Sequence, residues 1–259
     1  MRARWLKAGL AGLMALAMAQ GAFAQPDGAN PTCPSLATMQ FGDWNKMSFT
    51  LDTSSGRRVL IADGGMAFGS SFYLNKAIEA NQPVDEIVIR SPGGLVTEGI
   101  RMGFVIRKAG IPTRIPPGWW CASACSFAFL GGPVRTVNPG GVYAVHMFSK
   151  LSAQKLQSQV NEARESRGME KLLSELAEVE QNSAEVASDE NDYMIRMGAS
   201  RKLLTEIMYK QKSLDVGAGD RSTLRCLTEG EMEHYNVVNV WGGAAPTEAL
   251  KPSASAVRP

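Results

Sequence analysis

Apolar and polar residues along the first half of the chain follow two periods, one typical of strands and one typical of helices. Short apolar runs at residues 58–62, 85–90 and 111–115 predict three strands, bounded by turn-forming residues. Between them, residues 68–80 and 96–110 carry apolar side chains at helical spacing. Strands that alternate with helices in this way predict βαβ units and a parallel sheet, and therefore an α/β fold.

The stretch at residues 119–130, Trp-Trp-Cys-Ala-Ser-Ala-Cys-Ser-Phe-Ala-Phe-Leu, places Ser123 at a predicted strand-to-helix corner. The residues from Ala124 to Leu130 are apolar and lack Gly and Pro, so they can start a buried helix. The first turn of a helix has unpaired N–H groups that favour negative charge. A hydroxyl beside such donors suits acyl transfer from a serine, whereas the simpler interpretation is that Ser123 only caps the helix.

The second half of the chain has a different pattern. Short strands are predicted at residues 134–137 and 142–146, and the second of them ends in His146. Residues 151–197 are rich in Glu, Gln, Lys, Ala and Leu and contain no Pro, which predicts one or two long helices that project from the body. The remaining predicted elements are helices at 201–210 and 228–235, a loop at 216–222 and a closing strand at 237–240.

The chain begins with the charge pattern of a secretory signal peptide. Three basic residues within the first seven precede an apolar run at 8–19, and Ala22-Phe-Ala24 supplies a small-x-small cleavage motif. The apolar run is too short for a comfortable transmembrane span, so we expect cleavage after Ala24 and a periplasmic or secreted location. The predicted segments after it are a lead-in at 25–57 that opens with a loose loop at 25–34, one main domain at 58–241 and a disordered tail at 242–259.

Charge and cysteine content bear on three further properties: nucleic-acid binding, disulfide formation and metal binding. Without the signal peptide, the 27 basic residues of the chain fall to 24 against 25 acidic ones, so nothing in the charge indicates nucleic-acid binding. Four cysteines in an oxidising space allow two disulfides in three connectivities. We prefer Cys121 with Cys125 and Cys33 with Cys226, and the first bridge would brace the Ser123 corner. A metal site is the weaker interpretation, because Cys121 and Cys125 have no second close Cys/His pair.

Two histidines, His146 and His234, could serve as the imidazole base of a serine. His234 lies in a charged stretch, residues 229–234, and is interpreted as a solvated surface group. His146 ends an apolar strand, so it is the better candidate, with a buried core histidine as the alternative. In parallel sheets the chemistry lies at the carboxyl ends of the strands, where Ser91-Pro-Gly-Gly94 and Ser123 are also predicted.

These features resemble a known protease family. The segment Asp85-Glu-Ile-Val-Ile-Arg-Ser-Pro-Gly-Gly-Leu-Val-Thr-Glu-Gly99, a serine at a helix start, and a Pro-Gly turn before a strand that ends in histidine are similar to the Clp protease proteolytic subunit (ClpP) and its crotonase-fold serine peptidase relatives. The resemblance covers residues 58–240. It implies a ClpP/crotonase-like spiral of βαβ units with a parallel sheet, followed by a long helical segment after His146.

The resemblance also implies roles for individual residues. Ser123 matches the nucleophile of the family, and His146 matches its general base. The amides of Gly94 and Ala124 match the two donors to the oxyanion. Ser126 lies one turn into the helix, where a buried hydroxyl usually bonds to the preceding turn, so it is not expected to be the nucleophile.

The third member of the family's triad, an aspartate, has no direct counterpart in this sequence. Leu224 falls at its place in an ungapped alignment. Asp220 fits if about four residues are inserted, and Asp215 is the next candidate, although either could be an ordinary loop carboxylate. Lys150 could act as a base, as the lysine of signal peptide peptidase A does, but a lysine at a helix entrance is more commonly an exposed residue.

The function expected from the residues and the resemblance is that of an exported serine endopeptidase. It would cleave flexible or unfolded peptides through an acyl-enzyme, without a cofactor, a metal or nucleic acid. No ATPase partner is expected outside the cytoplasm, and the long helix makes a homo-oligomer plausible. Two alternatives remain open at this point: a catalytically inactive binding module with the same fold, and a crotonase-type enzyme that acts on acyl thioesters.

Overall fold

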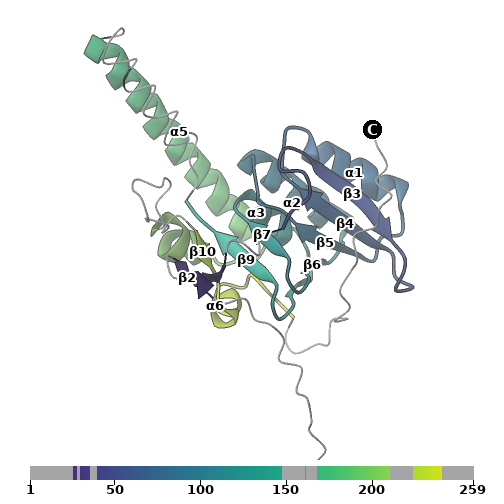
Figure 1. The fold of residues 1–259 in the computed structure, drawn as a ribbon. Helices are drawn as coiled ribbons and strands as arrows, with labels where there is room; N and C mark the ends of the chain where they lie inside the picture. The colour runs from purple at the N-terminus through teal and green to yellow at the C-terminus, as the bar shows by residue number, and fades with distance from the viewer. Residues whose placement is uncertain are drawn as a thin grey trace, which may run out of the picture.

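The computed structural model describes residues 26–27, 30–35, 40–147, 161, 168–210 and 224–240. They form an α/β protein around a five-stranded sheet in the order β3-β4-β5-β6-β8 (Figure 1). The antiparallel edge strand β3 pairs with β4, and all the other neighbours pair in parallel, which confirms the predicted α/β class and its mostly parallel sheet. The strands are β3 (Met47–Asp52), β4 (Val59–Gly64), β5 (Glu86–Arg90), β6 (Thr113–Ile115) and β8 (Arg135–Val137).

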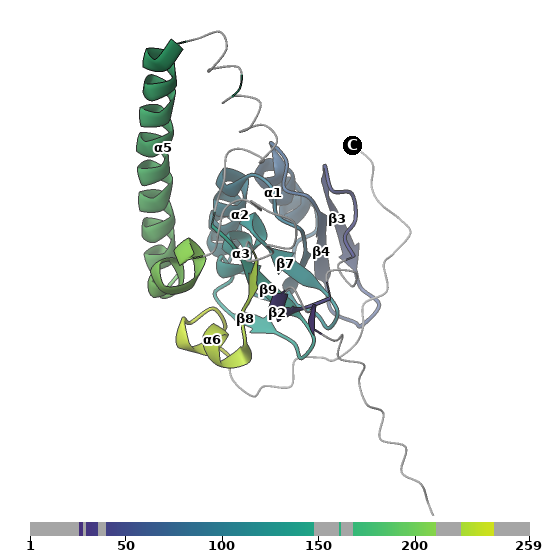
Figure 2. The same cartoon turned by 60° about the vertical axis from the view of Figure 1, so that its left-hand side comes forward.

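Three helices lie on one side of this sheet (Figure 2). They are α1 (Ser70–Ala80), α2 (Val96–Ala109) and α3 (Ala124–Leu130), and each follows a strand as the pattern predicts. Apolar side chains of the helices, such as Leu74 and Met102, pack in the same core as the strand residues Leu60 and Val88. The close approach of α2 to α3 depends on Gly99, because a Cβ there would lie 2.2 Å from the carbonyl oxygen of Ala124.

A second, three-stranded sheet joins the body at the carboxyl ends of the first. It has the order β10-β9-β7 and consists of β7 (Trp120–Ala122), β9 (Val142–Val145) and β10 (Arg225–Cys226). β7 and β9 run parallel, and β10 runs antiparallel to β9. Ser91 links the two sheets, because its amide donates to the Trp120 carbonyl (2.8 Å) and its carbonyl accepts from the Ala122 amide (3.0 Å).

The structure corrects the predicted lead-in. Residues 25–34 were expected to be loose, but the described ones form an antiparallel pair of short strands, β1 (Pro26–Asp27) and β2 (Asn30–Pro34). The disulfide between Cys33 and Cys226 ties β2 to β10, which overrides the turn-rich composition of the segment. The edge strand β3 also lies within the predicted lead-in, where no element was expected.

The structure also corrects the prediction of a closing strand near the end of the chain. No strand forms at residues 237–240; instead, the Val237 carbonyl accepts a hydrogen bond from Nε of the buried Arg135 (2.8 Å). The other guanidinium nitrogens of Arg135 donate to the carbonyls of Gly132, Met197 and Asn236, so one side chain ties the C-terminal segment to α5 and to the turn before β8. The predicted helix at 201–210 is irregular, with a π turn at Leu203–Ile207 and a 3-10 turn at Met208–Lys210.

Two further helices agree with the pattern. The short helix α6 (Glu229–His234) begins with a reciprocal capping box between Thr228 and Glu231. The long helix α5 (Gly168–Arg196) projects from the body (Figure 1). Its buried side chains among those described, Glu190, Tyr193 and Met194, lie in its last two turns. None of the helices in the described residues is both long and apolar enough to cross a membrane. The predicted signal peptide (1–24) and tail (242–259) lie outside the described residues.

Glu190 is a buried carboxyl group at the inner end of α5. The Tyr209 hydroxyl donates to its Oε2 (3.0 Å), and no described residue donates to its Oε1. Burial raises the pKa of Glu190 to about 7, although the hydrogen bond from Tyr209 acts in the opposite direction. The folded protein therefore favours the protonated form of this group.

We expect this carboxyl group to make the free energy of unfolding fall as the pH rises from 4.5 to about 7, because the folded chain binds the extra proton over that range. The contribution is full below 4.5 and lost above about 7, and amounts to roughly 3 kcal/mol at most. Urea unfolding at several pH values should show the unfolding free energy of the parent falling relative to that of Glu190→Gln over this range, because other groups titrate equally in both proteins. Glu185→Gln, the same change at an exposed position of α5, should follow the parent; a pH dependence in Glu190→Gln equal to that of the parent would contradict the assignment.

Candidate active site

Ser123 joins β7 to α3 with an unusual backbone conformation. Its φ is 57° and its ψ is −127°, a region that residues with a side chain rarely adopt. Its amide donates to the Ala144 carbonyl of β9 (3.0 Å), and its carbonyl accepts from the Ser126 amide (2.9 Å) and hydroxyl (2.7 Å). Main-chain hydrogen bonds on both sides therefore fix the corner, and Ser126 has the structural role that was expected of it.

The hydroxyl of Ser123 does not cap the helix. A capping serine has extended backbone, and its oxygen accepts a hydrogen bond from the first turn. Ser123 occupies the N-cap position of α3, but its backbone is not extended and its side chain accepts no capping hydrogen bond. The simpler interpretation of this serine as a helix cap is therefore wrong, and its half-buried hydroxyl is available for another role.

A disulfide closes across the corner. Cys121 lies in β7 and Cys125 in α3, their Cα atoms are 5.2 Å apart, and both side chains are fully buried. The bridge cross-links the end of the strand to the start of the helix, with Ser123 between the two. Both preferred pairings, this one and Cys33 with Cys226, are confirmed.

The glycines of Ser91-Pro-Gly-Gly94 lie against Ser123. Gly93 and Gly94 have φ values of 96° and 141°, which favour glycine. A Cβ on Gly93 would lie 2.6 Å from the Cβ of Ser123, whereas a Cβ on Gly94 would lie 2.3 Å from the Met66 carbonyl oxygen. The family resemblance gives a role to Gly94 and none to Gly93, but Gly93 is the glycine that packs on the serine.

Gly94 and Ala124 each have a backbone N–H near Ser123 that has no acceptor among the described residues. The Gly93 amide donates to Ser91 Oγ (3.1 Å) and the Leu95 amide to the Met66 carbonyl (2.9 Å). Between them, the amide of Gly94 finds no acceptor among the described residues, and the same is true of Ala124, the first residue of α3. Unpaired amides beside a serine are the donors that an oxyanion needs.

His146 directly follows β9, the parallel neighbour of β7. Because Ala122 pairs with Ala144, the chain leaves both strands at the same edge, with Ser123 on one and His146 on the other. The imidazole is half-buried, and its Nδ1 lies 2.7 Å from the Met147 carbonyl oxygen. Burial lowers the pKa of His146 from its ordinary value in spite of the opposing effect of that hydrogen bond, which favours the neutral ring, the form that can accept a proton.

Of the other candidate residues for the site, the structure describes only His234. His234 is exposed on α6 and contacts the Tyr235 ring edge-on, in keeping with a surface group. Asp215, Asp220 and Lys150 lie outside the described residues. Among the residues that are described, no carboxylate bonds to the His146 ring.

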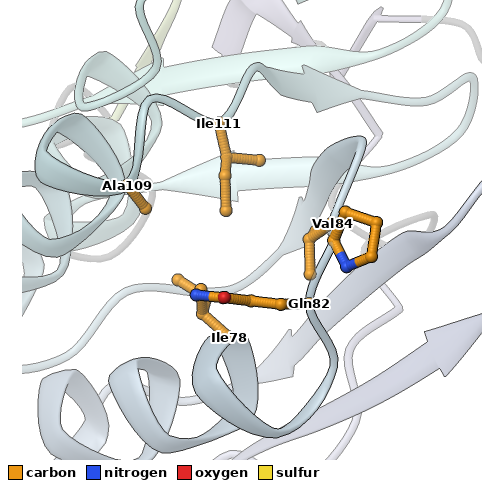
Figure 3. Close-up of a pocket in the computed structure, with 6 residues that line it drawn as sticks. Ile78, Gln82, Val84, Ala109 and Ile111 are labelled. Atoms are coloured by element: carbon orange, nitrogen blue, oxygen red, sulfur yellow. The ribbon is translucent and has the colours of Figure 1, made fainter.

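Two cavities of the structure lie away from this edge. One of about 460 Å³ is found where α1 and α2 end, before β5 and β6 begin, and therefore at the amino ends of the strands (Figure 3). Its lining residues are Ile78, Gln82, Pro83, Val84, Ala109 and Ile111. Another of about 330 Å³ lies between α2 and α5.

A scan against protein-family models and a search of curated proteins both find no match for this chain. The resemblance described above therefore stays a prediction.

The packing of Gly93 on Ser123 can be tested with two glycines of left-handed conformation. Gly110→Ala adds a Cβ at a φ of 68° with no atom within 4 Å, so it should cost about 1 kcal/mol of unfolding free energy from backbone strain alone. Gly93→Ala adds backbone strain at a φ of 96° and also forces the Ser123 corner aside, so it should cost roughly 3 kcal/mol or more. Urea denaturation measures both; equal costs would show that Gly93 does not support the corner.

Proposed function

We propose that this protein is a serine endopeptidase of the ClpP and crotonase-fold type, with Ser123 as nucleophile and His146 as general base. The observation that carries the proposal is the conformation of Ser123, a serine at a helix start that is held at positive φ and does not cap the helix. A conformation that costs free energy persists when the surrounding structure enforces it, and such conformations cluster at active sites. The unpaired amides beside it support the same conclusion.

In the proposed reaction, Ser123 Oγ attacks the carbonyl carbon of a peptide bond while His146 Nε2 takes its proton. The amides of Gly94 and Ala124 donate to the oxyanion of the tetrahedral intermediate. The C–N bond then breaks, and the imidazolium returns the proton to the leaving amine. Water attacks the resulting acyl-enzyme with His146 again as base, which releases the carboxylate product and restores the serine.

The setting of the site indicates the proposed substrates and partners. The proposed substrates are flexible or unfolded peptides, and the two disulfides are consistent with an exported protein. Leu173, Leu176 and Val179 are exposed on the projecting part of α5, which supports a homo-oligomer. The proposal includes no ATPase partner, no cofactor and no nucleic acid.

The pair of unpaired amides would also suit the alternative function, that of an enzyme acting on acyl thioesters. Two unpaired amides could also polarise the carbonyl of an acyl thioester, as in crotonase-type enzymes. Such chemistry has no use for a strained serine, whereas a peptidase requires its hydroxyl as the attacking group. A binding module would have no use for either feature.

A fluorophosphonate probe distinguishes these functions, because it phosphonylates an activated serine. We expect the purified protein to be labelled at one residue and Ser123→Ala to be unlabelled, with peptide hydrolysis reduced by roughly 10⁴-fold or more. Ser126→Ala removes the nearest other hydroxyl on the same helix and should remain labelled. An unlabelled parent protein, or label retained in Ser123→Ala, would contradict the peptidase.

A further inference from the structure

The His146 ring is held by its own main chain. Nδ1 lies 2.7 Å from the carbonyl oxygen of Met147, and this is the only hydrogen bond of the ring within the described part of the chain. The charged side chain on the neighbouring strand β10 is Arg225, which pairs with Val145 in the sheet register and forms its ion pair with Glu231 rather than with the ring. The imidazole therefore has a main-chain partner where a triad has a carboxylate.

A carbonyl oxygen can only accept a hydrogen bond, and this fixes the tautomer of a neutral His146. Nδ1 must carry the proton, and Nε2 must present a lone pair. This is the tautomer that a serine's general base requires, and in a triad the aspartate selects it. The same hydrogen bond also limits rotation of the ring, because its acceptor belongs to the adjacent residue.

From this geometry we infer that the Met147 carbonyl is the group that positions His146, so that the site operates as a Ser–His dyad oriented by the main chain. This inference rests on the proposed function and makes it more specific. It assigns no essential role to Asp220 or Asp215, the two candidates for the third position of the family's triad. A carbonyl dipole stabilises the imidazolium less than a full negative charge does, so the resulting base is weak but correctly oriented.

The tautomer can be observed directly in the full chain labelled with ¹⁵N-histidine. Long-range ¹H–¹⁵N correlation spectra distinguish a protonated from an unprotonated ring nitrogen, and His146→Gln assigns the two histidines. At pH 7.5 we expect His146 to carry its proton on Nδ1. The exposed His234 serves as the internal comparison and should show the Nε2–H form that predominates in water. A proton on Nε2 of His146 would overturn the inference, whether or not the protein has activity.

The role of the aspartates is tested with Asp215→Asn, Asp220→Asn and the double variant. We expect the His146 tautomer to be unchanged in all three, and the rate of fluorophosphonate labelling at Ser123 to change by less than about threefold. If either aspartate orients the ring, its loss should shift the tautomer and reduce the rate by up to about 10⁴-fold, as in triad enzymes. That result would overturn the main-chain dyad and leave the peptidase intact, whereas an unlabelled parent protein would overturn the peptidase alone.

Discussion

The site depends on the enforced backbone conformation of Ser123. A residue with a side chain at a φ of 57° carries a strain of about 1–3 kcal/mol, which the surrounding structure has to offset. Three constraints act on it together: the Cys121–Cys125 bridge, the hydrogen bond from its amide to Ala144, and the packing of Gly93. The absence of a side-chain cap follows from this corner, which also places the hydroxyl beside the Ala124 amide, a group with no acceptor among the described residues. The chemistry proposed here therefore depends on the corner.

The fold brings the remaining groups to the same edge. Parallel pairing of β7 with β9 makes Ser123 and His146 leave their strands together, and Ser91 connects this second sheet to the end of β5. The Gly93–Gly94 turn is thereby placed against the serine. The core helices pack behind the strands and support this edge. The close packing of α2 at Gly99 against Ala124 fixes the start of α3.

Local patterns predicted most of the central fold, because long apolar runs and helical spacing carry their own signal. The strands β3, β7 and β10 were missed, since elements of two to six residues with mixed composition are stabilised by their partners rather than by their own sequence. The predicted closing strand at residues 237–240 was wrong, because Arg135 donates to the carbonyl of Val237 at its start and to that of Asn236 just before it. In the site, sequence spacing pointed to Ser123 and His146, but it could not show which glycine packs on the serine or that Met147 holds the ring.

The central claim is that the Ser123 hydroxyl, the His146 ring and the amides of Gly94 and Ala124 converge on one reacting carbonyl. A crystal structure of the protein after covalent reaction with a peptidyl phosphonate measures this convergence directly. The account predicts a bond from Ser123 Oγ to phosphorus, a phosphonyl oxygen about 2.7–3.1 Å from both amide nitrogens, and His146 Nε2 facing the leaving-group side. An adduct whose oxygen points into solvent, away from both amides, would contradict it.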